Sequence, residues 1–72
     1  MTSKSARIRF GQRVRELRKK MGLSQEELGF KSKLHRTYIG SIERGEQNIS
    51  IDNIDKLSKV LKVNLSELFK SL

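Results

Sequence analysis

Three short segments of the chain repeat one arrangement of side chains. Each has an apolar residue, then a Ser or Asn, and a second apolar residue five positions after the first; they span residues 23–28, 49–54 and 63–68. The Ser or Asn can cap the first turn of a helix, and the two apolar residues can pack against each other across that cap. The repeats therefore predict helices over residues 25–32, 51–61 and 65–71.

Two further helices follow from apolar spacing. Phe10, Val14, Leu17 and Met21 recur every three or four residues, which predicts a helix over residues 7–21 that Gly22 ends. Residues 1–5 are small and polar, and we expect a loose arm there. A fifth helix over residues 36–44 would turn Ile39 and Ile42 inward. The expected fold is all-α: one compact five-helix domain over residues 1–72, with a helix-turn-helix at about residues 24–44.

The outer face of the helix over residues 36–44 carries the chemistry. Opposite its two isoleucines lie two guanidinium groups, two hydroxyls and a glycine, from Arg36, Thr37, Gly40, Ser41 and Arg44. Guanidinium and hydroxyl groups suit base edges and phosphates, and a glycine lets another backbone come close. An ordinary solvated helix more often carries Glu and Lys at such positions. This face therefore predicts contact with nucleic acid.

The charge distribution points the same way. The net charge is +8, and residues 1–22 hold eight Lys and Arg residues against one Glu. Concentrated positive charge is expected of a surface that binds a polyanion. It also fits simple solubility, so charge alone decides little.

Several classes of protein are disfavoured. The chain has no Cys and one His, so neither a metal site, a cofactor site nor a catalytic triad is expected. It has no apolar run long enough to cross a membrane and no signal-peptide pattern, which favours a cytoplasmic protein. A membrane-surface peptide would need a free apolar stripe on the first helix, whose four apolar residues a helical core would use.

Three stretches carry a family resemblance: LRKKMGLSQEEL, RTYIGSIERG and QNISIDNIDKLSKVLKVNLSELF. From about Phe10 to Phe69 the chain resembles the lambda-repressor-like, Xre/Cro-type helix-turn-helix family. Within it, LHRTYIGSIERG on so short a chain is similar to the controller proteins of restriction–modification systems. The resemblance implies a sequence-specific, dimeric transcription regulator without a cofactor. A phage-type repressor and an antitoxin-like protein-interaction module are the alternatives, and RNA polymerase is a candidate second partner.

The resemblance also implies residue roles. Arg36, Thr37 and Ser41 match base-reading positions, and Tyr38 matches a position that touches the DNA backbone or a thymine methyl. Gln25 and Asn48 match phosphate contacts. Arg18 and Glu43 match a structural ion pair between the first and third helices.

Some positions depart from that pattern. Gly29 stands where alanine is usual, and Lys33 occupies a turn position usually held by glycine or asparagine, so a positive φ is expected there. His35 replaces a capping Asp or Ser; it could cap the helix or lie near a phosphate. Arg44 is a further expected phosphate contact, and Phe30, on the polar side of its helix, is the one candidate for a protein-binding patch.

The end of the chain predicts self-association. Leu65, Leu68, Phe69 and Leu72 form an apolar stripe wider than one small core needs. Leu68 would be committed to the core by its contact with Val63. We therefore expect Leu65, Phe69 and Leu72 to form a homodimer interface, which would place two recognition helices on a two-fold symmetric operator. The alternative is that Phe69 completes the core of the monomer.

Overall fold

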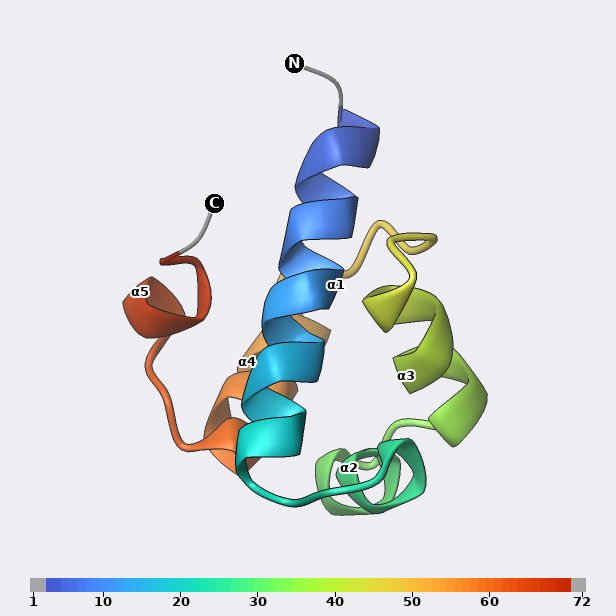
Figure 1. The fold of residues 1–72 in the computed structure, drawn as a ribbon, viewed down its shortest axis with the longest axis vertical. Helices are drawn as coiled ribbons and strands as arrows, with labels where there is room; N and C mark the ends of the chain where they lie inside the picture. The colour runs from blue at the N-terminus through green and yellow to red at the C-terminus, as the bar shows by residue number, and fades with distance from the viewer. Residues whose placement is uncertain (1–2, 71–72) are drawn as a thin grey trace.

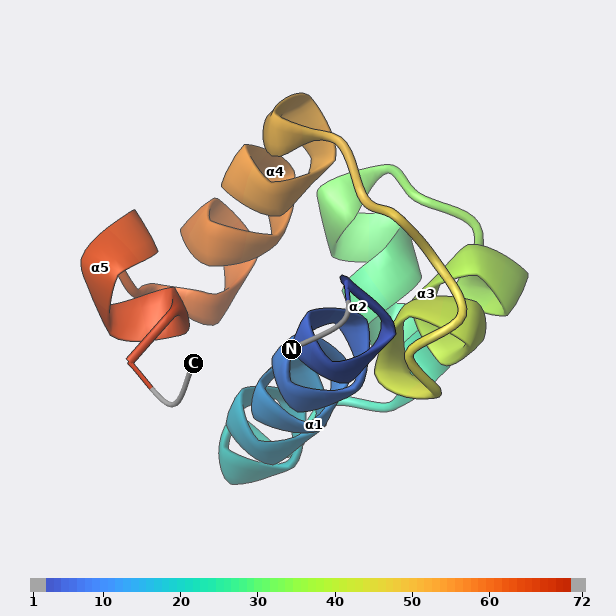
Figure 2. The ribbon, with the colours of Figure 1, turned by 90° about the horizontal axis from the view of Figure 1, so that it is seen from above.

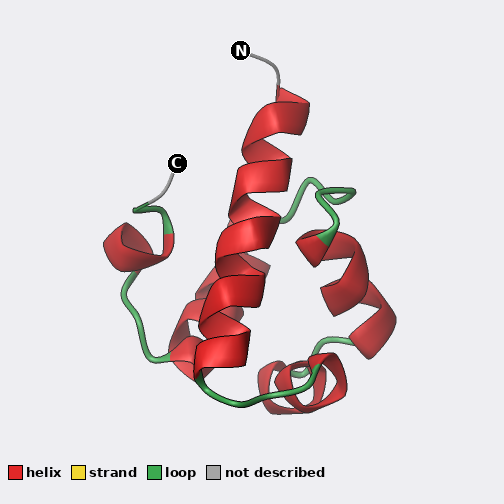
Figure 3. Cartoon of the chain, in the orientation of Figure 1, coloured by secondary structure: helices red, strands yellow, loops and turns green. Residues whose placement is uncertain are grey.

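The chain folds into helices joined by short turns, as a computed structural model that describes residues 3–70 shows (Figures 1 and 3). In chain order the helices are α1 (Ser3–Lys20), α2 (Gln25–Ser32), α3 (Arg36–Glu43), α4 (Ile51–Leu61) and α5 (Leu65–Leu68). Residues 3–70 contain no strand. The predicted all-α, five-helix class is confirmed.

Three helices differ from their predicted bounds. Helix α3 ends at Glu43, one residue before its predicted end, and Arg44 is its C-cap. Helix α1 begins at Ser3 rather than at residue 7, so the expected arm is wrong for residues 3–5, while residues 1–2 lie outside the described part. Residues 3–6 contain no Gly or Pro and include Lys4 and Ala6, which favour a helix. The helix therefore begins several residues before Phe10, the first residue of the apolar series. Helix α5 ends at Leu68, three residues before its predicted end.

The three predicted caps are present. The Ser24 hydroxyl accepts from the Glu27 N–H at 3.0 Å, and a Glu27 carboxylate oxygen accepts from the Ser24 N–H at 2.8 Å. At α4 the Ser50 hydroxyl accepts from the Asn53 N–H at 3.2 Å, and at α5 the Asn64 side-chain oxygen accepts from the Glu67 N–H at 2.7 Å. The Glu67 carboxylate does not complete a capping box there and contacts the Arg13 guanidinium of α1 at 3.1 Å. Caps of this kind contribute about 1 kcal/mol each.

The core lies where all five helices meet. Its buried apolar side chains are Phe10, Val14, Leu17, Leu28, Ile39, Ile42, Ile54, Leu57, Leu61 and Leu68. Met21 is 39 % exposed, so its expected place in the core is wrong. The reason is that α1 ends one residue earlier and Met21 belongs to the following turn.

Helix α1 lies between α5 and α3 in the view of Figure 1, and the view from above shows it on the opposite side of the molecule from α4 (Figure 2). Where α1 meets the end of α3, the backbones come very close at Gly11. A Cβ atom there would overlap the carbonyl oxygens of Ile42 and Glu43. This close backbone contact fixes the position of α3 along the axis of α1.

Phe69 has a partner within its own chain. Its ring lies against Phe10 of α1, with centroids 5.5 Å apart and planes inclined by 33°. This contact agrees with the alternative that Phe69 contributes to the core of the monomer. The two residues are far apart in sequence, so the pairing depends on how α5 returns to α1. Leu65 is 37 % exposed, and Leu72 lies outside the described residues.

Two lysines adopt left-handed backbone conformations. Lys33, at the end of α2, has φ = 61°, as the departure from the family pattern predicts. Lys62, at the end of α4, has φ = 59° and was not predicted. None of the helices in residues 3–70 combines the length and apolar content that crossing a bilayer requires.

Candidate nucleic-acid interface

Helix α3 is anchored by its apolar side and exposed at its first turn. Ile39 and Ile42 are buried in the core, whereas Arg36 and Thr37 are exposed. The helix packs against both α1 and α2, so its covered sector is wide. The accessible groups are consequently concentrated at its amino end.

His35 forms the cap of this helix. Its Nδ1 atom accepts from the Thr37 N–H at 3.0 Å. A ring nitrogen that accepts carries no proton, so in the neutral side chain Nε2 carries it and is the free donor. The same histidine can therefore cap α3 and offer an N–H outward.

Two of the four predicted base-reading residues are less accessible than expected. Ser41 is 7 % exposed, and its hydroxyl donates to the Tyr38 carbonyl at 2.7 Å. Tyr38 is half-buried against the core, and its hydroxyl accepts from the Asn53 side chain at 3.2 Å. The expectation that Ser41 lies on the solvent face is wrong, because α3 is covered on two sides.

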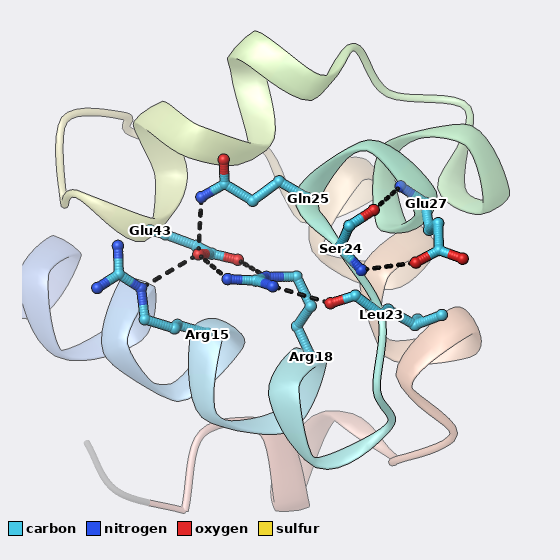
Figure 4. A network of polar contacts seen from close by, with 7 residues as sticks. All are labelled: Arg15, Arg18, Leu23, Ser24, Gln25, Glu27 and Glu43. Carbon is cyan, nitrogen blue, oxygen red and sulfur yellow. Dashed lines mark hydrogen bonds and ion pairs between the residues drawn. The ribbon is translucent and has the colours of Figure 1, made fainter.

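A buried carboxylate joins the helices behind this surface (Figure 4). Glu43, at the end of α3, accepts from Arg18 Nε at 2.6 Å and from Arg18 Nη2 at 3.0 Å. The same carboxylate accepts from Arg15 Nε at 3.3 Å and from Gln25 Nε2 at 3.1 Å. Arg18 also donates to the Leu23 carbonyl at 2.8 Å. One side chain thus ties α3 to both α1 and α2.

The environment of Glu43 favours its charged form. Burial alone would raise the pKa of this carboxyl, but hydrogen bonds from Arg18, Gln25 and Arg15 outweigh burial and lower the pKa. The ionised carboxylate therefore holds Arg18 and Gln25 in place near neutral pH. Gln25, an expected phosphate contact, is oriented by this bond.

The guanidinium of Arg44, the C-cap residue of α3, lies next to Gly40. A Cβ atom at Gly40 would stand 3.1 Å from Arg44 Nη1 and 3.4 Å from Gln25 Oε1, so the absence of a side chain makes room for both groups. Arg44 also binds the Glu46 carboxylate through Nε at 3.0 Å and Nη2 at 3.2 Å. This pairing raises the pKa of Arg44 and lowers that of Glu46.

The structure brings four of the eight predicted DNA-contacting residues together. One hollow between α2 and α3 is lined by Gln25, Glu26, Arg36, Thr37, Gly40 and Arg44. His35 lies beside it, with Phe30 and Leu34. Asn48 lies elsewhere, in the loop before α4, where it lines a groove with Ile49 and Phe69. Among residues 3–70, no three His, Asp or Glu side chains are placed to hold a metal ion.

The comparisons with known proteins agree with this geometry. Residues 14–68 match the helix-turn-helix family HTH_3. The chain belongs to this family. The matched residues include α2, α3 and α4.

Similar proteins include several named as controllers. Control protein C.BamHI of Bacillus amyloliquefaciens is 54 % identical over 63 residues, which cover 86 % of this chain and 78 % of that protein. Control protein C.MunI of a Mycoplasma species is 46 % identical over 92 % of this chain and 90 % of its own length. The crystal structure of the restriction–modification controller protein C.AhdI from Aeromonas hydrophila superposes with a TM-score of 0.86 at 50 % identity, covering 89 % of this chain and 97 % of that one.

Two residues of the helix-turn-helix surface were missed from the sequence. Glu26 lies 3.5 Å from Arg36, and Glu46 pairs with Arg44. The Arg44–Glu46 spacing was visible in the sequence as a pair two residues apart. The Glu26–Arg36 pair bridges two helices across the turn, so no local spacing indicates it.

Proposed function

We propose that this helix-turn-helix protein is a DNA-binding transcription regulator that reads a specific duplex sequence as a homodimer and controls the expression of restriction–modification genes. The observation that carries the proposal is the presentation of α3. Its first turn offers Arg36 and Thr37 to solvent, while Ile39, Ile42 and Glu43 fix its other side to the core. A helix held in this way can enter a major groove without losing its orientation.

Base reading is assigned to the exposed turn. Arg36 has the reach and the paired donors for guanine O6 and N7, and Thr37 can contact a neighbouring base. Tyr38 is assigned a supporting contact with the DNA backbone or a thymine methyl, since its hydroxyl accepts from Asn53 but can still donate. Ser41 is assigned no base contact, because it is buried and its hydroxyl donates to the Tyr38 carbonyl. Specificity then depends mainly on the amino end of α3.

Phosphate contacts are assigned to Gln25, His35 and Arg44, which lie around α3, and to Asn48 in the loop before α4. Gln25 stands at the first turn of α2, where backbone N–H groups and the helix dipole favour an anion. His35 offers Nε2–H, Arg44 a guanidinium, and the exposed Asn48 an amide. Such contacts set the register of the protein on DNA but carry no sequence information.

The homodimer is proposed to form through α5 and the residues beside it. Leu65 exposes an apolar side chain, and Phe69 is only partly buried against Phe10. Leu72, which lies outside the described residues, would extend this surface. A two-fold pair would place two α3 helices in successive major grooves, about 10 base pairs apart or a small multiple of one turn.

A protein-interaction module is the second candidate, and Phe30 favours it. Its side chain is 85 % exposed on α2. We propose this exposed aromatic side chain as a contact for a protein partner, for which RNA polymerase is a candidate. A regulator with this surface could bind DNA and a protein together, so the two functions are compatible.

Selection of bound sites from random duplex DNA tests the proposal. We expect enrichment of one inverted repeat. For the selected duplex, a plot of log K against the logarithm of the salt concentration should have a steep negative slope, of about −0.9 for each phosphate that the protein neutralises. Sedimentation with anionic liposomes is the parallel control and should show no comparable binding. A library that yields no enriched sequence, together with an affinity indifferent to salt, would contradict the proposal.

A further inference from the structure

Two arginines lie at the ends of α3, Arg36 at its first position and Arg44 directly after its last, and each is paired with a carboxylate of the same chain, but in different ways. Arg36 contacts the Glu26 carboxylate through Nη1 alone, at 3.5 Å. Arg44 contacts both oxygens of Glu46, through Nε at 3.0 Å and Nη2 at 3.2 Å. All four side chains are more than half exposed. The difference lies in which edge of each guanidinium remains free.

For Arg36 the recognising edge is open. Within residues 3–70, no hydrogen bond engages its Nε or Nη2 atoms. These two nitrogens present parallel N–H donors, which match guanine O6 and N7. The single contact to Glu26 is on the terminal nitrogen away from that edge. Glu26 can therefore hold the side chain while the edge binds a base.

For Arg44 the same edge is closed. Its Nε and Nη2 donors already bind a carboxylate in the forked geometry that a phosphate would also take. Arg44 must release Glu46 before it can grip a phosphate through this edge. Glu46 thus competes with every DNA sequence equally.

We propose that Glu26 is a positioning residue that sets sequence specificity by holding Arg36 with its Nε–Nη2 edge presented to the major groove. The inference rests on the proposed DNA-binding function. It assigns a role to a side chain that makes no base contact of its own. Exposed ion pairs are weak, so Glu26 biases the orientation of Arg36 without locking it.

The bias separates correct from incorrect DNA. On the correct sequence, Arg36 binds guanine and keeps its contact with Glu26. On other sequences no guanine is in place, and the most favourable contact for Arg36 is a DNA phosphate. Turning to that phosphate breaks the Arg36–Glu26 contact and leaves the Glu26 carboxylate unpaired beside the negatively charged DNA backbone. Glu26 therefore weakens binding to incorrect sequences more than binding to the correct one.

The test compares Glu26→Gln with Glu46→Gln. Both variants replace an exposed carboxylate by a neutral side chain of the same shape. Each therefore removes one negative charge from the same surface and raises the net charge of the protein by one. The dissociation constants for the selected duplex and for a random duplex of equal length are measured by fluorescence anisotropy at one salt concentration. Arg36 Nε–H order parameters are measured by NMR in the free protein, before any DNA is added.

Glu26→Gln should tighten binding to random DNA by about three- to eightfold, as one added charge implies. Its affinity for the selected duplex should not rise, so the ratio of the two affinities falls by at least threefold. The Arg36 order parameter should also fall. Glu46→Gln should tighten binding to both duplexes alike and leave the ratio within about twofold.

Two results would overturn the inference. One is a Glu26→Gln variant whose ratio of affinities for selected and random DNA stays within about twofold of wild type, as expected for Glu46→Gln. The other is an Arg36 order parameter that is the same in Glu26→Gln as in wild type. Wild-type protein that fails to distinguish any duplex would instead contradict the proposed function. The order parameter separates these cases, because it reports on Arg36 without DNA.

Discussion

The Arg18 guanidinium binds the Glu43 carboxylate through two nitrogens, with Nε–Oε2 at 2.6 Å and Nη2–Oε1 at 3.0 Å. The Glu43 side chain is fully buried, and Arg18 is nearly so. Because Glu43 is the last residue of α3, this pair sets the orientation of the whole helix against α1. Any loss of the pair should therefore affect both stability and the surface that α3 presents.

Replacing Arg18 by Met should destabilise the protein strongly. Glu43 would keep Arg15 and Gln25, but a buried charge would lose its main partner, at a cost of about 3 kcal/mol. Urea denaturation measures the change in the free energy of unfolding. Lys59→Met, which removes an exposed i,i+4 pair with Asp55, is the matched control and should cost less than about 0.5 kcal/mol. Equal losses in the two variants would contradict the assignment.

Glu43 should also contribute to acid sensitivity. Its hydrogen-bonded partners lower its pKa in the folded state below the usual value of 4.5. The unfolded chain therefore takes up this proton at a higher pH than the folded chain, so the stabilisation present above pH 4.5 is lost as pH falls through the lowered pKa. Denaturation curves between pH 2 and pH 6 should show a smaller pH-dependent change in Glu43→Gln than in wild type. An unchanged pH dependence would show that other carboxyl groups govern the acid transition.

Gly11→Ala tests the contact between α1 and α3. The added Cβ would overlap backbone carbonyl oxygens, which cannot move aside without displacing α3, so we expect a loss of about 2–3 kcal/mol. At Gly22, by contrast, a Cβ has open space, and the residue's φ of 73° leaves a cost of about 1 kcal/mol for the alanine variant. Thermal unfolding of both variants gives the comparison. A Gly11→Ala variant as stable as wild type would mean that the helices are farther apart.

Leu65→Ser tests the proposed dimer better than Phe69→Ala. Phe69 packs against Phe10 within the chain, so truncating it would damage the monomer as well. Leu65 is more exposed, and its loss should shift sedimentation equilibrium toward monomer with little loss of stability. The exposed Ile51 provides a control through Ile51→Ser. Unchanged dimerisation in Leu65→Ser would mean that the dimer forms through another surface. A wild type that is monomeric at tens of micromolar would contradict the proposed homodimer.

Local signals predicted much of the fold. The Ser24–Glu27 capping box and the Ser50 cap depend on residues three positions apart, and the bounds of α2 and α4 match their prediction. The starts and ends that failed lack such signals. Nothing in residues 3–6 marks a helix start by apolar spacing, and the end of α5 depends on the packing of Phe69 against Phe10 rather than on a glycine.

The sequence indicated individual residues of the candidate site better than the contacts between them. The face of α3 indicated Arg36, Thr37 and Arg44, but the pattern could not show that Ser41 is buried. It also could not show that Glu26 lies beside Arg36, since that contact forms only when the turn brings α2 and α3 together. Interactions across helices are the part that the structure supplies.

The central claim is that the first turn of α3 reads DNA sequence, and Arg36→Ala tests it most directly. The measurement is the ratio of dissociation constants for random and selected duplexes, wild type against variant, at one salt concentration. A bidentate arginine–guanine contact contributes about 1–3 kcal/mol of discrimination, so the ratio should fall by roughly 5- to 150-fold while some binding to random DNA remains. An unchanged ratio in the Arg36→Ala variant would contradict the account.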